Sequence, residues 1–262
     1  MARTHAAALA AALLLSLAAR ADTTAGDAAP AQPDLRIPPD CRVDVPFQTP
    51  APLRGLDQAL NARRPVKLLL IGPTSAAGIG ATSAFAAYPA RLEKILEAHF
   101  KGVDFEVIRR GLSREVAEDQ VERVKLEVAD VLPDLVVWQV GARDAMARVD
   151  PDEFAISLAA AVTWFRENRI DLVLVEPPYS ERRATDDYFL AFIKAIDAVA
   201  ESEQVPLIRR YEAMRALAAH ETRQNDEPPD PMQLTELGYR CLGHYVADTI
   251  IRGIRLASGK GP

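Results

Sequence analysis

The sequence predicts a three-layer α/β/α domain, doubly wound around a five-stranded parallel sheet. The first observation behind this prediction is a series of short runs rich in Val, Leu and Ile, each largely apolar on both faces. Strands that are covered on both faces of a parallel sheet have this appearance. The expected strands span residues 66–71, 103–108, 134–140, 171–175 and 205–208.

The second observation is that the segments between these runs have helical periodicity. In residues 115–132 the apolar stripe consists of Val116, Val121, Val124, Val128 and Val131. That spacing places one helix face against a sheet. Repeated strand–helix units of this kind imply a doubly wound domain, with helices in both outer layers. The expected helices span residues 91–100, 115–132, 154–168, 186–202 and 236–254.

The N-terminus precedes this pattern and reads as a signal peptide over residues 1–21. Arg3 supplies a positive start, an Ala/Leu run follows, and residues 19–21 (Ala-Arg-Ala) fit a cleavage site. The alternative is a buried Ala/Leu helix. Residues 22–52 form a linker-like arm with seven prolines between Pro30 and Pro52, a density that should block regular helix and strand. We therefore expect an exported, periplasmic or secreted protein with its folded domain over residues 53–258.

The chain contains two cysteines, Cys41 and Cys241. In an exported protein, an even number of cysteines suggests a disulfide. This disulfide would join the N-terminal arm to the last helix, whereas the alternative is two unrelated buried thiols. There is no CxxC motif, and the Cys and His spacing predicts no metal site.

Charge and hydropathy exclude several classes of partner. The formal net charge is −6, from 31 basic and 37 acidic residues, which argues against nucleic-acid binding. Beyond the N-terminus no apolar stretch is long enough for stable membrane insertion. No cofactor is expected, because the glycine-rich turn over residues 72–80 lacks both nucleotide-binding motifs. The oligomeric state is left open.

In doubly wound sheets the functional site lies beyond the carboxyl ends of the strands. Thr74 and Ser75 follow the first strand and present hydroxyl groups in a glycine-rich turn, and Gly111 follows the second strand. Residues 141–144 (Gly-Ala-Arg-Asp) follow the third. Residues 230–233 (Asp-Pro-Met-Gln) come shortly before the last helix.

Taken in order, these four segments resemble the catalytic blocks of the SGNH (GDSL-type) hydrolases, in particular an exported branch. The resemblance covers roughly residues 65–254 and implies a flavodoxin-like fold and ester hydrolysis, often of acyl or acetyl groups. In that family a Ser attacks the ester carbonyl, and a His oriented by an Asp accepts the proton. The amides of Ser and Gly and an Asn side chain stabilise the oxyanion.

Three of the resembling positions carry other residues. Thr74 stands at the nucleophile position, where its methyl group hinders attack. Gln233 replaces the base and cannot accept a proton, which leaves Asp230 without an imidazole to orient. Arg143 replaces the oxyanion Asn, while Gly111 is retained. Losing the nucleophile or base of a Ser triad costs on the order of 10⁴ to 10⁶ in turnover, so triad-type activity should be low or absent.

Two functions remain open. In the first, the chain is a binding module whose cleft takes a small anionic or glycan-type ligand through Arg143, with Arg114 or Arg109 nearby. The alternative for these arginines is pairing with local acids such as Asp144, Glu115 or Asp230. The second function is an ester hydrolase with non-standard machinery.

In the hydrolase hypothesis, Thr74 or the alternative nucleophile Ser75 attacks the ester. Asp230 or His220, as a substitute base, assists the attack. Of the histidines beyond the signal peptide, we expect only His220 to lie in a loop on the site side. His99 should lie at the opposite end of the sheet, and His244 within the last helix. A structural envelope protein that uses its surface is a third alternative.

Overall fold

The computed structural model describes residues 35–72, 83–111, 117–221 and 236–259. The chain divides into two units, residues 1–32 and 33–262, and the described residues all belong to the second. The expected signal peptide therefore lies outside the described residues. Among the described residues, no helix has the length and apolar character needed to cross a membrane.

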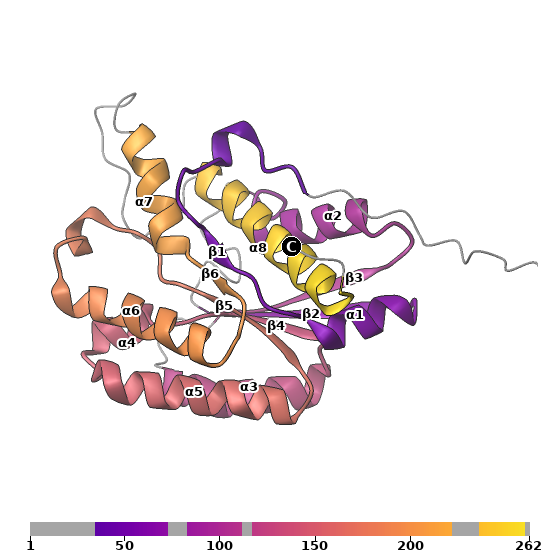
Figure 1. Ribbon diagram of the computed structural model, residues 1–262, viewed down its shortest axis with the longest axis horizontal. Helices are drawn as coiled ribbons and strands as arrows, with labels where there is room; N and C mark the ends of the chain where they lie inside the picture. Colours follow the sequence, from indigo (N-terminus) through magenta and orange to yellow (C-terminus); the bar gives the residue numbers. More distant parts are fainter. Residues whose placement is uncertain (1–34, 73–82, 112–116, 222–235, 260–262) are drawn as a thin grey trace, which may run out of the picture. The chain divides into compact units, whose positions relative to one another are not determined.

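The sheet in this unit has six strands in the order β1-β6-β5-β4-β2-β3 (Figure 1). Neighbouring strands are parallel except β1, which pairs antiparallel with β6. The chain runs from β2 outward to β3 and then continues at β4 on the other side of β2. The strands are β1 (Gln48–Thr49), β2 (Val66–Gly72), β3 (Phe105–Gly111), β4 (Leu135–Gln139), β5 (Asp171–Val175) and β6 (Leu207–Ile208).

The five parallel strands confirm the predicted core of the sheet, and β1 corrects the predicted number. Gln48 and Thr49 lie between Pro46 and Pro50, in the arm where no strand was expected. Two residues free of proline are enough here because β1 is an edge strand that pairs on one side only, with Leu207 and Ile208. Proline is tolerated next to such an edge.

The helices cover both faces of the sheet, as expected. Figure 1 shows α1, α2 and α8 on one side and α3, α4, α5 and α6 on the other. Three helices were not expected from the sequence, namely α1, α4 and α7. The α-helices are α1 (Arg54–Asn61), α2 (Tyr88–His99), α3 (Ala117–Val131), α4 (Ala142–Ala147), α5 (Pro151–Glu167), α6 (Asp187–Ser202), α7 (Arg210–Glu221) and α8 (Glu236–Ala257), and two 3₁₀ turns are η1 (Pro39–Cys41) and η2 (Glu181–Arg183).

The core forms two layers because alternate residues of each strand point to opposite faces. On β4, Leu135 and Val137 pack in the layer that contains α2 and α8. Val136 and Trp138 pack in the other layer, with α5 and α6. Successive residues of a strand are thus buried in opposite core layers. For this reason the sequence of each predicted strand is apolar on both faces.

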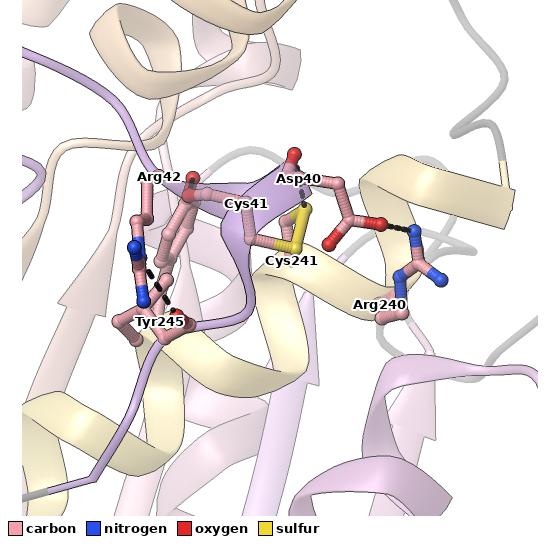
Figure 2. Close-up of a disulfide and its surroundings, with 7 residues drawn as sticks. Asp40, Cys41, Arg42, Arg240, Cys241 and Tyr245 are labelled. Carbon is pink, nitrogen blue, oxygen red and sulfur yellow. Dashed lines mark hydrogen bonds and ion pairs between the residues drawn. A yellow bond between two sulfur atoms is a disulfide. The ribbon is translucent and has the colours of Figure 1, made fainter.

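The N-terminal arm is fastened to α8 by the expected disulfide between Cys41 and Cys241 (Figure 2). Beside it, the Tyr245 hydroxyl donates to the Cys41 carbonyl at 2.6 Å, and Arg240 forms an ion pair with Asp40. Further along α8, a Cβ at Gly253 would come within 2.9 Å of the Ala51 carbonyl oxygen, so glycine allows the arm to approach closely. The arm is thus an integral layer over α8 in the folded unit.

Candidate functional site

The candidate site lies at the carboxyl edge of the sheet, where β2 and β4 are neighbours although the chain visits β3 between them. This change of direction is the switch point at which doubly wound folds bind ligands. Of the residues predicted for the site, Gly111 and Arg143 are described. Thr74, Ser75, Arg114, Asp230 and Gln233 lie outside the described residues.

Two predicted blocks are adjacent at this edge. Gly72 and Gly111 end β2 and β3 and are partners in the parallel register. Gly72 has a φ of 151°, and a Cβ there would come within 2.6 Å of the Gln139 Cβ. Glycine is therefore required at the position that leads into residues 73–82, both by backbone conformation and by the close approach of β4.

Arg143 lies in the first turn of α4, which begins directly after Gly141 at the end of the β4 segment. Its Nη1 lies 3.9 Å from the Met146 sulfur, and its Nε is buried without an acceptor. Within the described ranges Arg143 makes no ion pair, and thus none with Asp144, whereas Glu115 and Asp230 lie outside the described residues. The guanidinium is half-buried and retains donors for a ligand.

A second group of cations follows β5. The pKa of Arg183 is lowered, first by burial and also by the nearby charges of Arg182 and Arg143, while the charge of Asp186 opposes the shift. The Arg183 guanidinium lies over the Phe189 ring, 5.2 Å from its centroid. The mutual effect of Arg183 and Arg143 places η2 and α4 close together, so both contribute positive charge to this part of the edge.

A buried polar cluster that the sequence did not predict lies at the end of β4. The Gln139 Nε2 donates to the Tyr88 hydroxyl at 2.8 Å, and Arg210 Nη1 donates to Gln139 Oε1 at 3.2 Å. Arg210 and Gln139 are 2% and 4% exposed. Tyr239, beside Gly238 in α8, is close enough to affect the pKa of Arg210. The four residues come from β4, α2, α7 and α8.

Burial shifts the pKa values in this cluster in the directions that disfavour charge. The pKa of Arg210 is lowered to about 10, so the group stays cationic at neutral pH. The pKa of Tyr88 is raised by burial, against the opposing effect of its hydrogen bond with Gln139. The cluster is therefore one cation among neutral groups.

Glu176 is a further buried group at the same edge, directly after β5. Its Oε2 accepts from the Tyr211 amide at 3.1 Å, and its Oε1 has no partner. Burial and, secondarily, the charge of Asp197 raise its pKa to about 8. At neutral pH this carboxyl is largely protonated and caps the start of α7 as a neutral group.

The structure corrects the predicted position of His220 and confirms the other two. His220 lies in α7, which follows β6 almost directly, and not in a loop. His99 ends α2 ahead of β3, and His244 lies inside α8, as expected. Burial lowers the pKa of both His99 and His244. No group of three or more His, Cys, Asp or Glu residues that could hold a metal occurs in the described ranges.

The fold and the order of these segments define a class. Solved structures with the same architecture include TesA, with 22% identity and a TM-score of 0.58 over 70% of this chain and 97% of that one. They also include a catalytic mutant of Axe2, an acetylxylan esterase from Geobacillus stearothermophilus, with 20% identity and a TM-score of 0.58 over 73% and 94%. A G-D-S-L lipolytic protein from Desulfitobacterium hafniense DCB-2 has 22% identity and a TM-score of 0.55 over 70% and 99%.

The chain therefore has the fold of the SGNH hydrolase superfamily, as its sequence blocks indicated. A family model that matches residues 40–256 is more specific: the chain belongs to the non-GDSL lipase-like family. None of the curated protein sequences matches it.

Proposed function

We propose that this protein is an exported SGNH-hydrolase-like protein that has lost most triad chemistry and uses its cleft to bind a small anionic or glycan-type ligand. The observation that carries the proposal is Arg143. It stands at the oxyanion Asn position of the third block, keeps a buried Nε without an acceptor, and makes no ion pair with a described residue. A guanidinium with unused donors suits a carboxylate or phosphate.

Two sequence features support the loss of chemistry. Gln233 has no titratable group at the base position, and Thr74 brings a hindered hydroxyl to the nucleophile position. Either change alone costs a Ser-type enzyme on the order of 10⁴-fold or more in turnover, and the losses do not simply add.

Export is supported by the N-terminal sequence and by the disulfide. Disulfides persist in oxidising compartments, and Cys41 and Cys241 are paired. N-terminal sequencing of the protein recovered from outside the cytoplasm tests this part: the mature chain should begin at Asp22. A chain that still begins at Met1 in that fraction would contradict cleavage.

The binding proposal is tested by calorimetric titration of the mature protein with glucuronate and with an acetylated xylo-oligosaccharide. The xylo-oligosaccharide is chosen because several neighbours in fold are acetylxylan esterases. Arg143→Met should weaken binding at least tenfold, because a charge-assisted contact is lost. Arg54→Met is the matched control, since Arg54 is exposed in the first turn of α1 and has no role in the predicted site. Equal affinity in the Arg143 variant would contradict the role given to this residue.

The alternative is an active ester hydrolase that uses Thr74 or Ser75, and the esterases among the fold neighbours favour it. Hydrolysis of p-nitrophenyl acetate by the mature protein separates the two functions. Turnover that disappears in Thr74→Ala or Ser75→Ala would overturn the binding proposal. Activity that arises only in the triple variant Thr74→Ser, Arg143→Asn, Gln233→His would show instead that the scaffold is retained and the chemistry is missing.

A further inference from the structure

The buried cluster around Gln139 has a charge that the described residues leave without a counter-charge. Arg210 is 2% exposed, and the groups that act on it electrostatically are the phenols of Tyr88 and Tyr239. No carboxylate in the described ranges forms an ion pair with it. Burial lowers the pKa of Arg210, but only to about 10, so the cation persists at neutral pH.

The hydrogen bonds of the guanidinium show where a partner would bind. Nη1 donates to Gln139 Oε1, and Nε is covered and has no acceptor. The Nη2 atom of Arg210 makes no hydrogen bond within the described ranges. It is nevertheless not one of the fully buried atoms that lack a hydrogen-bond partner. The small exposed part of Arg210 therefore includes Nη2, which is the guanidinium nitrogen that a ligand oxygen can reach.

The surrounding groups have the polarity that an anion requires. The Tyr88 hydroxyl accepts from Gln139 Nε2, which leaves its own proton for another acceptor. Gln139 holds Arg210 and Tyr88 at the two ends of one carboxamide. A buried charge without a partner is costly, typically by several kcal/mol, so evolution rarely keeps one that has no use.

We propose that Arg210, with the Tyr88 hydroxyl as a second donor, forms a binding site for a carboxylate group at the carboxyl end of β4. One cation balances one carboxylate, whereas a phosphate monoester carries about −1.5 to −2 at pH 7 and would leave excess negative charge in a buried site. The site adjoins Gly72 at the switch point of the sheet, through the contact between Gly72 and Gln139.

This inference rests on the proposed function in one respect, namely that the carboxyl edge receives a ligand. It adds the chemical class of the group that is recognised and a residue distinct from Arg143. Gln139 lies two residues after Val137, and residues two apart in a strand point to the same face. Gln139 therefore belongs to the face of β4 that α2 and α8 cover.

The test is the melting temperature of the mature protein in acetate against chloride at constant ionic strength and pH 7. Acetate at about ten times its Kd should raise the Tm of the wild type by roughly 3 °C relative to chloride. Arg210→Met should abolish this difference without lowering the Tm in chloride, because it removes an unpaired buried charge and keeps the side-chain volume. Arg54→Met is the matched control, because Arg54 is exposed in the first turn of α1, and it should keep the acetate response.

Several results would overturn the inference. The first is an acetate response that survives in Arg210→Met. The second is a response that is lost in Arg143→Met instead, which would leave the proposed function standing. The third is a large loss of Tm in chloride on Arg210→Met, which would show that an acid of this chain neutralises Arg210. The fourth is a stronger Arg210-dependent response to phosphate than to acetate.

If Arg210→Met does not fold, two measurements decide the question on folded protein. Tyr88→Phe should reduce the acetate response, and the Arg210 Nε–H resonance of the wild type should shift with acetate in ¹⁵N NMR. An unmoved resonance at saturating acetate would overturn the site. Loss of the proposed function is seen separately, as ester turnover that depends on Thr74 or Ser75.

Discussion

The two ends of strand β5 each carry an acid, half-buried Asp171 and fully buried Glu176, and the two acids differ in how many of their oxygens have hydrogen-bond partners. Asp171 begins the strand and accepts from the Leu56 amide at 2.8 Å, at the start of α1. Burial raises its pKa, while backbone hydrogen bonds from Leu56, Gly55 and Arg54 oppose the shift. Glu176 follows the other end, where one oxygen accepts from Tyr211 and the second has no partner.

The same difference extends along both edges of the sheet. At the amino edge, Asp134 forms an ion pair with Arg64 and accepts from the Lys67 amide at 3.0 Å. At the carboxyl edge, the Nε atoms of Arg143 and Arg210 are buried without acceptors. Buried polar groups in folded proteins almost always have partners, so the exceptions require an explanation.

We infer from the contrast between these charged groups that the carboxyl edge is the one available to a ligand. At the amino edge, Asp134 and Asp171 join strands to neighbouring segments through their carboxylate oxygens, whereas the Nε2 atom of His99 there is buried and has no partner in the described ranges. At the carboxyl edge, cationic donors and a carboxyl oxygen are held in place but are not consumed by the fold. This arrangement is what a site prepared for a ligand requires, and it supports the cleft-binding proposal over a fold whose surface alone is used.

The largest expected effect concerns the covalent bond that holds the start of α8. Replacing Cys41 and Cys241 with Ser should lower the free energy of unfolding by about 4–5 kcal/mol, because the disulfide spans 200 residues and restricts the unfolded chain. Urea unfolding followed by circular dichroism measures the loss.

The control for this prediction is the neighbouring ion pair of Arg240 and Asp40. Both side chains are substantially exposed, at 39% and 47%. Asp40→Ala should therefore cost at most about 1 kcal/mol. A disulfide-free variant as stable as this control would show that noncovalent packing alone fixes α8 to the arm.

The next prediction uses the unsatisfied acid, Glu176. Its folded-state pKa of about 8 lies above that of an unfolded glutamate, so the folded protein binds more protons between pH 4.5 and 8. This contribution to stability is therefore present at low pH and is lost as the pH rises toward 8, by at most about 1.4 kcal/mol per pH unit.

Glu176→Gln should remove that dependence. Urea unfolding at pH 5.5, 6.5 and 7.5 measures the free energy of unfolding. The free energy of the variant should rise relative to that of the wild type with each increase in pH. Glu181→Gln is the control, because Glu181 is exposed in η2. Parallel pH profiles of Glu176→Gln and the wild type would mean that Glu176 is ionised in the folded protein throughout this range.

Much of this fold could be predicted from sequence because its strands are covered on both faces. Residues 171–175 form β5 with the predicted bounds. The prediction was less accurate where the chain lacks that pattern: of residues 205–208 only Leu207 and Ile208 pair as strand, because the Val205 amide bonds back to the end of α6. Helix α7 was missed because most of its apolar residues are alanines, which leave only Tyr211, Met214 and Leu217 to mark an apolar stripe.

The candidate site was predictable in part. The glycines that end β2 and β3 and the place of Arg143 after β4 follow from motif order along the chain. The Gln139 cluster does not, because its members come from residues 88, 139, 210 and 239 and meet only through the fold. Gln139 could be seen to end a strand, but its burial depends on Arg210 and Tyr88, more than 50 residues away on either side.

The smallest expected effect concerns Asp171 at the start of β5, whose carboxylate accepts hydrogen bonds from the backbone of α1. Asp171→Ala should lower the free energy of unfolding by about 1–2 kcal/mol, because the first amides of α1 lose their acceptor. Asp171→Asn retains an oxygen and should cost less. Urea unfolding measures both, and hydrogen exchange should show faster exchange of the Leu56 amide in Asp171→Ala.

The outcome bears directly on the comparison between the two ends. At pH 7.5 the amino-end variant Asp171→Asn should be neutral or destabilising, whereas the carboxyl-end variant Glu176→Gln should be stabilising. Both changes replace an acid with its amide at an end of one strand. Opposite changes in the free energy of unfolding would therefore be caused by the different surroundings of the two side chains. If the two variants instead change stability in the same direction, the edges do not differ in the way that their hydrogen bonds indicate, and the unpartnered groups at the carboxyl edge lose their value as markers of a ligand site.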